Sequence, residues 1–113
     1  MRSAEAGSLA LAALLAVLAS RPAAAASPVA ANGPVEYQCT EAGGGNDTLI
    51  ATFYQTQPAM ALIVHHDEAR PAFQVPAASG AKYEGQDVTF WDAHGEATVT
   101  WSGSQLECKP RRR

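Results

Sequence analysis

Hydrophobic and β-branched residues recur along the chain in short runs that alternate with polar positions and end at turn residues. Runs of about four to eight residues, separated by glycine, proline, asparagine or aspartate, are typical of β-strands. After the leader, no stretch has the spacing of an amphipathic helix. The sequence predicts strands over Val35–Thr40, Thr48–Gln55, Met60–His65, Ala72–Pro76, Ala81–Glu84, Asp87–Trp91, Ala97–Trp101 and Gln105–Lys109.

These short, evenly spaced strands predict an all-β protein, either a small antiparallel barrel or a sandwich. A barrel would also remove the exposed sheet edges that a small exported domain must otherwise protect. Alternation supports the strand assignment, since Val88, Phe90 and Asp92 share one face while Thr89 and Trp91 share the other. The predicted core contains Tyr37, Leu49, Phe53, Leu62, Val64, Phe73, Val75, Phe90, Val99 and Leu106.

The first 26 residues have the pattern of a secretory signal peptide. Arg2 is the positive end, Leu9 to Leu18 form an apolar core, and Ala24-Ala25-Ala26 is a small-residue cleavage site. This core is too short to span a bilayer of roughly 30 Å, and no cysteine adjoins the cleavage site for lipid attachment. We therefore expect a soluble periplasmic protein without a membrane anchor. Its expected organisation is a signal peptide over 1–26, a linker over 27–34, one domain over 35–109 and a basic tail over 110–113.

The chain has two cysteines, Cys39 and Cys108, near the two ends of the expected domain. Because export delivers the chain to an oxidising compartment, we expect them to form a disulfide. A bridge that closes a loop of about 70 residues would stabilise a small fold by about 4 kcal/mol in the chain-entropy model.

Charge is distributed unevenly. The precursor has 8 basic and 11 acidic residues, and removal of the leader leaves six against ten. Four of the six basic residues lie in the tail: Lys109, Arg111, Arg112 and Arg113. The body is therefore acidic, which disfavours nucleic acid and anionic membranes and favours a basic protein partner.

The residues that could carry catalysis do not form a persuasive active site. Ser79, Asp92 and His94 could be drawn as a triad, but Asp92 and His94 lie at one strand end and Ser79 lacks a nucleophile-elbow sequence. We therefore expect a protein that is not an enzyme and has no cofactor.

A metal site is also not expected. His65 and His66 are adjacent, so in a strand their side chains would point to opposite faces of the sheet. His94 is distant in sequence, and a metal site needs three or four ligands that converge.

The most informative segment is Ser79-Gly80-Ala81-Lys82-Tyr83, followed by the aromatic strand around Phe90-Trp91 and the turn before Glu96-Ala97. By pattern alone, the first segment is a hairpin with a small exposed hydroxyl at a glycine turn. Together with the opening Val35-Glu36-Tyr37-Gln38-Cys39 and the closing Leu106-Glu107-Cys108, it resembles the periplasmic and membrane-bound inhibitors of c-type lysozyme, the MliC/PliC family.

The resemblance implies an eight-stranded antiparallel barrel that inserts a loop into the lysozyme active-site cleft. Ser79 would sit at the loop tip and hydrogen-bond the two catalytic carboxylates of the enzyme. Gly80 would allow close approach of the backbone, Lys82 would lie within the contact loop, and Tyr83 would buttress the loop and add contact area.

The second motif departs from the family pattern, which commonly reads Phe-Trp-x-Lys-Gly-x-Glu-Ala. A gap-free alignment places Ala93 at the lysine position and His94 at the glycine, whereas a shift of one residue lets His94 replace the lysine and Gly95 keep the glycine. We expect Asp92, Ala93 and His94 at the edge of the contact, without the fixed cation.

The sequence as a whole thus predicts an eight-stranded antiparallel β-barrel, closed by one disulfide, that inhibits c-type lysozyme and so protects peptidoglycan. The alternatives are a barrel that binds a small molecule or an envelope ligand, and a structural module of the cell envelope.

Overall fold

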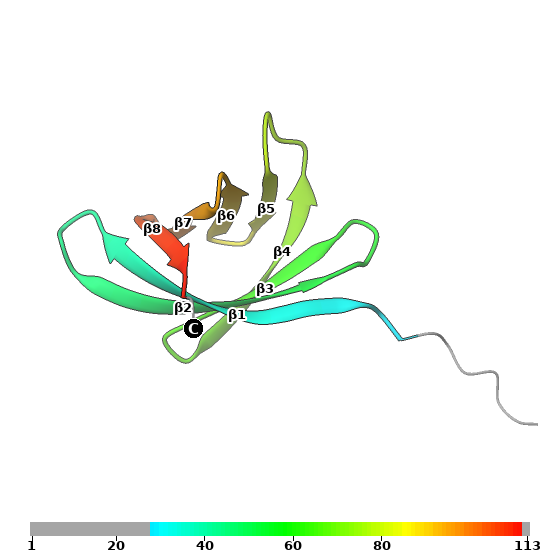
Figure 1. The fold of residues 1–113 in the computed structure, drawn as a ribbon, viewed down its shortest axis with the longest axis horizontal. Helices are drawn as coiled ribbons and strands as arrows, with labels where there is room; N and C mark the ends of the chain where they lie inside the picture. The colour runs from blue at the N-terminus through cyan, green and yellow to red at the C-terminus, as the bar shows by residue number, and fades with distance from the viewer. Residues whose placement is uncertain (1–27, 112–113) are drawn as a thin grey trace, which may run out of the picture.

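Eight antiparallel strands form a closed barrel in the computed structural model, which describes residues 28–111 (Figure 1). Each strand pairs with its neighbours in sequence, and the last strand pairs with the first. The strands are β1 (Ala31–Glu41), β2 (Asn46–Tyr54), β3 (Met60–His65), β4 (Glu68–Val75), β5 (Ala81–Gly85), β6 (Val88–Ala93), β7 (Glu96–Trp101) and β8 (Ser104–Pro110). The predicted fold class is confirmed, while the predicted signal peptide lies outside the described residues.

Two strands, β1 and β4, begin four residues earlier than predicted. β1 starts at Ala31, within the segment expected to be a linker, because Ala31 and Asn32 pair with the end of β2. β4 starts at Glu68 because a tight turn lets the chain pair again at once, with His65 opposite Glu68. Strand pairing of polar residues next to a turn is not visible in the sequence, because the hydrogen bonds of the ladder use only their backbone groups.

Half of the predicted core is confirmed and the rest needs correction. Five of the predicted core residues are buried: Tyr37, Leu49, Phe90, Val99 and Leu106. Phe53 is only partly buried and packs against this core. The prediction is wrong for four others: Phe73 is 44% exposed, and Leu62, Val64 and Val75 are only half-buried.

These errors arise from the choice of which alternate residues of β3 and β4 face the interior of the barrel. In β3 nearly every residue is apolar, so the sequence does not show which alternate set faces inward. Pairing decides it, because directly opposed residues of an antiparallel ladder share a face. Ile63 pairs with the buried Ala51 and Ala61 pairs with the buried Ala72, so the neighbours of these residues point outward.

Cys39 and Cys108 form the predicted disulfide. They are opposite each other in the β1–β8 ladder, which closes the barrel, and both are buried. The bridge therefore joins the two strands that are farthest apart in the sequence.

The simple strand order separates the connections into two ends. The β2–β3, β4–β5 and β6–β7 connections lie at one end, which we call the Ser79 end. The β1–β2, β3–β4, β5–β6 and β7–β8 turns lie at the other, the His65 end. Within residues 28–111, no helix has the length and hydrophobicity of a membrane span.

Candidate functional site

Ser79 lies on the β4–β5 connection, which extends beyond the ends of its two strands (Figure 1). The residue is exposed. Its backbone carbonyl accepts a hydrogen bond of 2.8 Å from the indole Nε1 of Trp91, on the neighbouring strand β6. The loop is thus tied to the barrel next to Ser79, while the serine side chain is on the solvent side.

Gly80 brings the same loop close to β6. Its φ of +68° lies in the left-handed region that side chains rarely adopt. A Cβ at this position would meet the carbonyl oxygen of Asp92 and would lie 2.8 Å from the Cβ of Ala93. Gly80 is therefore required by the approach of the loop to its own barrel, a reason that the sequence did not reveal.

Lys82 is partly covered by its neighbours. It pairs with Trp91 in the β5–β6 ladder, and its Nζ lies 5.3 Å from the centroid of the Trp91 ring. The same Nζ is 3.6 Å from Glu84 Oε2. The ammonium group is therefore held over the indole that anchors Ser79, so Lys82, Trp91 and Ser79 form one connected unit.

Tyr83 points into the barrel and is only 7% exposed. Its ring centroid lies 5.7 Å from that of Phe53 and 6.3 Å from that of Phe90, in tilted and edge-on arrangements typical of aromatic clusters. The tyrosine therefore supports the loop from inside the barrel and has little surface to offer to a partner.

Asp92 also lies on the inner face of β6, two residues after Phe90, and is half-buried. Burial raises the pKa of its carboxyl group. Burial also raises the pKa of Tyr37 to about 12, with the nearby Asp92 charge as the next cause and Tyr83 as a further one. Asp92 thus faces the tyrosines of the interior rather than the outer edge of the barrel.

The β6–β7 turn is the neighbour of the Ser79 loop. Ala93 pairs with Glu96, so the turn consists of His94 and Gly95, with φ values of 56° and 81°. Positive φ at both residues is the geometry of a two-residue hairpin turn, and it leaves His94 exposed at the tip.

A hollow of about 430 Å³ joins this turn to the loop. Its lining consists of Ser79, Trp91, Ala93, His94, Glu96 and Thr98. The fold therefore brings together three of the predicted site residues, Ser79, Ala93 and His94, and leaves Tyr83 inside. Trp91 and Glu96 were missed as site residues, although the Phe-Trp and Glu-Ala pairs of the second motif contain them.

A comparison with known families identifies the family of the chain. The family model of MliC, the membrane-bound lysozyme inhibitor of c-type lysozyme, matches residues 37–107. The chain belongs to the MliC family. Members of this family are inhibitors of c-type lysozyme rather than enzymes, and they are located in the cell envelope. The predicted family and the predicted inhibitor function are therefore confirmed.

Among solved structures, the chain is similar to Pseudomonas aeruginosa MliC in a crystal structure with hen egg white lysozyme. The sequence identity is 20% and the TM-score is 0.48, with 96% of this chain and 99% of that chain covered. No curated protein matches the sequence.

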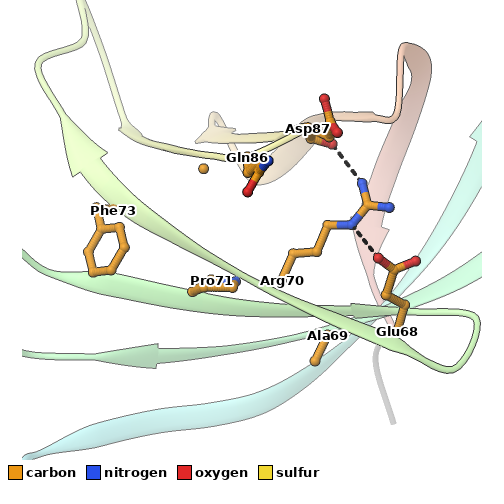
Figure 2. Close-up of a pocket in the computed structure, with 8 residues that line it drawn as sticks. Glu68, Ala69, Arg70, Pro71, Phe73, Gln86 and Asp87 are labelled. Atoms are coloured by element: carbon orange, nitrogen blue, oxygen red, sulfur yellow. Dashed lines mark hydrogen bonds and ion pairs between the residues drawn. The ribbon is translucent and has the colours of Figure 1, made fainter.

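At the His65 end of this MliC-family barrel, Arg70 joins three turns, and Figure 2 shows its bonds to Glu68 and Asp87. Its Nε donates to Glu68 Oε2 at 2.9 Å, and its Nη1 donates to the Asp87 carbonyl oxygen and to Ser102 Oγ. The guanidinium carbon lies 3.9 Å from the centroid of the Trp101 ring. A hollow of about 690 Å³ lies beside this network, along β4 and the β5–β6 turn. Because the hydrogen bonds of Arg70 link turns of the barrel itself, this network stabilises the fold.

The expectation that the side chains of His65 and His66 point to opposite faces of the sheet is wrong. Their rings stack with centroids 4.0 Å apart, and both Nε2 atoms approach Asp47 Oδ2, at 2.6 and 3.1 Å. His65 ends β3 and points inward, whereas His66 is the first turn residue with a φ of 51°. The strand alternation that separates neighbouring side chains ends before His66, so the turn rotates its ring onto that of His65.

Proposed function

We propose that this MliC-family protein inhibits c-type lysozyme by placing the Ser79 loop in the active-site cleft of the enzyme. The observation that carries this proposal is the exposed Ser79 on a loop whose backbone is anchored to Trp91. Lys82 adjoins this anchor, and Ala93 and His94 lie beside it across the hollow. Together these residues make a single protruding surface at one end of the barrel.

The chemistry of a serine suits such a cleft. A glycosidase cleft contains a protonated carboxylic acid near a carboxylate. A hydroxyl group can accept a hydrogen bond from the acid and donate one to the carboxylate. Because the hydroxyl is neutral, it also adds no further negative charge to the cleft.

The anchoring also favours affinity. A loop that is already held in its bound shape loses less conformational entropy on association. The bond from Trp91 and the close approach of Gly80 to β6 both restrict the loop before it meets a partner. His94, at the exposed tip of the neighbouring turn, takes the place of the family lysine in this proposal, and Asp92 contributes only from inside the barrel.

The interior of the barrel supports an inhibitor more than a ligand-binding barrel. Tyr37, Phe53, Tyr83 and Phe90 occupy it with ring centroids 5.4 to 6.3 Å apart. Side chains therefore fill the space in which a small molecule would have to bind.

For location, we propose a soluble periplasmic form, based on the leader pattern and on the use of both cysteines of the sequence in one disulfide. Recovery of the protein in the soluble periplasmic fraction would support this form, and recovery only with membranes would contradict it.

The variant Ser79→Ala tests the mode of inhibition. Loss of hydrogen bonds to charged groups costs about 1.5–3 kcal/mol, so we expect inhibition to weaken by about 10- to 100-fold. The measurement is the clearing of a cell-wall suspension by a c-type lysozyme at increasing inhibitor concentration. Ser104→Ala is the matched control, because Ser104 is an exposed serine at the His65 end. Full potency of Ser79→Ala would contradict the loop model.

A second variant, Trp91→Phe, tests the anchor. It keeps an aromatic ring and removes the donor to the Ser79 carbonyl. We expect weaker inhibition with an unchanged fold, since the loop would then lose more entropy on binding. If neither variant weakens inhibition although both bind lysozyme, another surface of the barrel makes the contact.

A further inference from the structure

Three potential metal ligands converge at the His65 end of the barrel. Asp47 Oδ2, His65 Nε2 and His66 Nε2 lie within 4.8 Å of one another. The carboxylate oxygen is 2.6 Å from His65 Nε2 and 3.1 Å from His66 Nε2. Two imidazoles and one carboxylate, all directed at one point, form a donor set that binds divalent transition metals.

The fold creates this convergence from three different positions. Asp47 lies near the start of β2, on the inward face that it shares with Leu49 two residues later. Leu49 pairs with His65, so the Asp47 side chain and the His65 ring meet at the rim of the barrel. The turn then places His66 against the outer side of the same carboxylate.

The ligand atoms must move apart to hold an ion, most of all at the contact between Asp47 and His65. With metal–ligand bonds of about 2.0–2.2 Å, the ligand atoms of a tetrahedral site lie roughly 3.3–3.6 Å apart. From the carboxylate oxygen, His66 Nε2 at 3.1 Å is too close by a few tenths of an ångström, and His65 Nε2 at 2.6 Å is too close by about 0.7–1.0 Å. The side chain of His66 is 71% exposed, so its ring can move outward by a few tenths of an ångström at little cost, whereas His65 is buried and the opening of its contact falls mainly on Asp47.

Two of the three ligands are supported by their surroundings. The backbone N–H of Thr48 donates to Asp47 Oδ1 at 2.9 Å, which fixes the carboxylate and leaves Oδ2 directed at the histidines. His65 packs edge-on against Trp101, with ring centroids 5.0 Å apart, and Arg70 covers the Trp101 ring. The site is therefore built on residues that the fold already restrains.

One feature limits its strength. His65 Nδ1 is buried and has no hydrogen-bond partner among the described residues. Most metal-binding histidines donate a hydrogen bond from their second ring nitrogen, and loss of that partner weakens metal binding by about 10- to 100-fold. We therefore expect binding that is specific but weaker than that of a fully supported zinc site.

The site has room and charge for a cation. A hollow of about 320 Å³ is lined by both histidines and also by Glu41 and Glu68, with Arg70 as its basic residue. Within this hollow Arg70 is paired with Glu68, so the carboxylate of Glu41 leaves a negative balance. Water or a further carboxylate can complete the coordination from this hollow.

We propose that Asp47, His65 and His66 bind one divalent transition-metal ion of the zinc class. The site lies at the opposite end of the barrel from Ser79, so a lysozyme bound at the Ser79 loop would not cover it. The proposal is thus independent of the mode of lysozyme inhibition.

Zinc titration of the purified, oxidised protein tests this site, with calorimetry for stoichiometry and thermal unfolding as a second measurement. We expect one Zn²⁺ per chain. At a tenfold excess over Kd, we expect the Tm to rise by about 5 °C or more, because the ion binds only the folded state.

His66→Asn is the informative variant, because asparagine tolerates the left-handed backbone of this turn. His94→Asn is its matched control, since His94 has a similar φ of 56° in the turn of another hairpin. We expect His66→Asn to bind Zn²⁺ at least tenfold more weakly and to inhibit lysozyme as the wild type does, while His94→Asn keeps wild-type zinc binding.

Three results would overturn the proposal: no stoichiometric binding by the wild type, unchanged binding by His66→Asn, or an equal loss in His94→Asn. The last result would mean that zinc adsorbs to any exposed histidine. Asp47→Asn provides a further check, since it keeps the size of the side chain and removes the charge, and unchanged zinc affinity in this variant would also contradict the site.

Discussion

Single residues at the Ser79 end act through neighbours that lie on other strands. Gly80 is needed because β6 leaves no space for a side chain, and Trp91 uses its indole N–H to hold the loop. Asp92 is the exception in this group. Its carboxyl group lies on the inward face with the tyrosines, and burial raises its pKa, so its charged form is a cost to the fold near neutral pH.

Asp92→Asn should therefore stabilise the protein at pH 7. Because its folded pKa is raised above the unfolded value, the carboxyl group favours the folded state at low pH, and this contribution is lost as the pH rises through the folded pKa. We expect a gain of less than about 1 kcal/mol at pH 7, since water still screens the group. The gain should shrink near pH 4 and below.

Urea unfolding at pH 7 and pH 4 measures this effect. Asp67→Asn is the control for net charge, because Asp67 lies in the exposed turn of the His65 end. An equal change at both pH values, or no gain at pH 7, would contradict the assigned role of the Asp92 charge.

At the scale of elements, the β1–β8 pair completes the barrel. Strand pairs that are adjacent in sequence are joined by short turns, whereas β1 and β8 must meet from opposite ends of the domain. Their ladder extends from Tyr37 opposite Pro110 to Glu41 opposite Leu106, and the Cys39–Cys108 bridge lies within it. Arg111 adds a bond of 2.9 Å to Glu36 beside the same ladder. The bridge therefore joins the strand pair whose formation costs the most chain entropy.

The double variant Cys39→Ala/Cys108→Ala should lose about 4 kcal/mol of unfolding free energy. The two cysteines are 69 residues apart, so removal of the bridge increases the conformational entropy of the unfolded chain and stabilises the unfolded state by that amount. Urea unfolding against the oxidised wild type is the measurement. A loss below about 1 kcal/mol would mean that the barrel closes without help from the bridge.

At the scale of the whole molecule, the barrel separates its two candidate sites and has an acidic body. From residue 27 to residue 108 the sequence contains Arg70 and Lys82 as its only basic residues, and both lie in local contacts with glutamates. Such a body attracts a basic enzyme over distances longer than a hydrogen bond. The electrostatic field of the acidic body therefore affects the rate of association more than the lifetime of the complex.

Association with a basic c-type lysozyme should accordingly depend on salt. Between about 10 mM and 0.5 M NaCl, where the Debye length falls to a few ångströms, we expect the association rate constant to fall by about tenfold or more. The dissociation rate constant should change much less. Surface plasmon resonance across a salt series separates the two, and a salt effect confined to dissociation would contradict steering.

Much of the fold could be read from the sequence because each strand is a local pattern. The eight strands, the Cys39–Cys108 bridge and the alternation around Phe90 depend on residues near one another or on the oxidising destination of the chain. The predicted core failed at Leu62 and Phe73, where the choice of inward face depends on a partner strand.

Some features of the candidate sites could likewise be predicted from the sequence, and others could not. Its motif showed that Ser79 lies on a turn and which family the chain joins, since both are properties of consecutive residues. The anchor from Trp91, the inward direction of Tyr83 and the stacking of His65 on His66 over Asp47 were decided only by the tertiary structure. They depend on strand register and turn geometry, which bring together groups that a linear pattern does not relate.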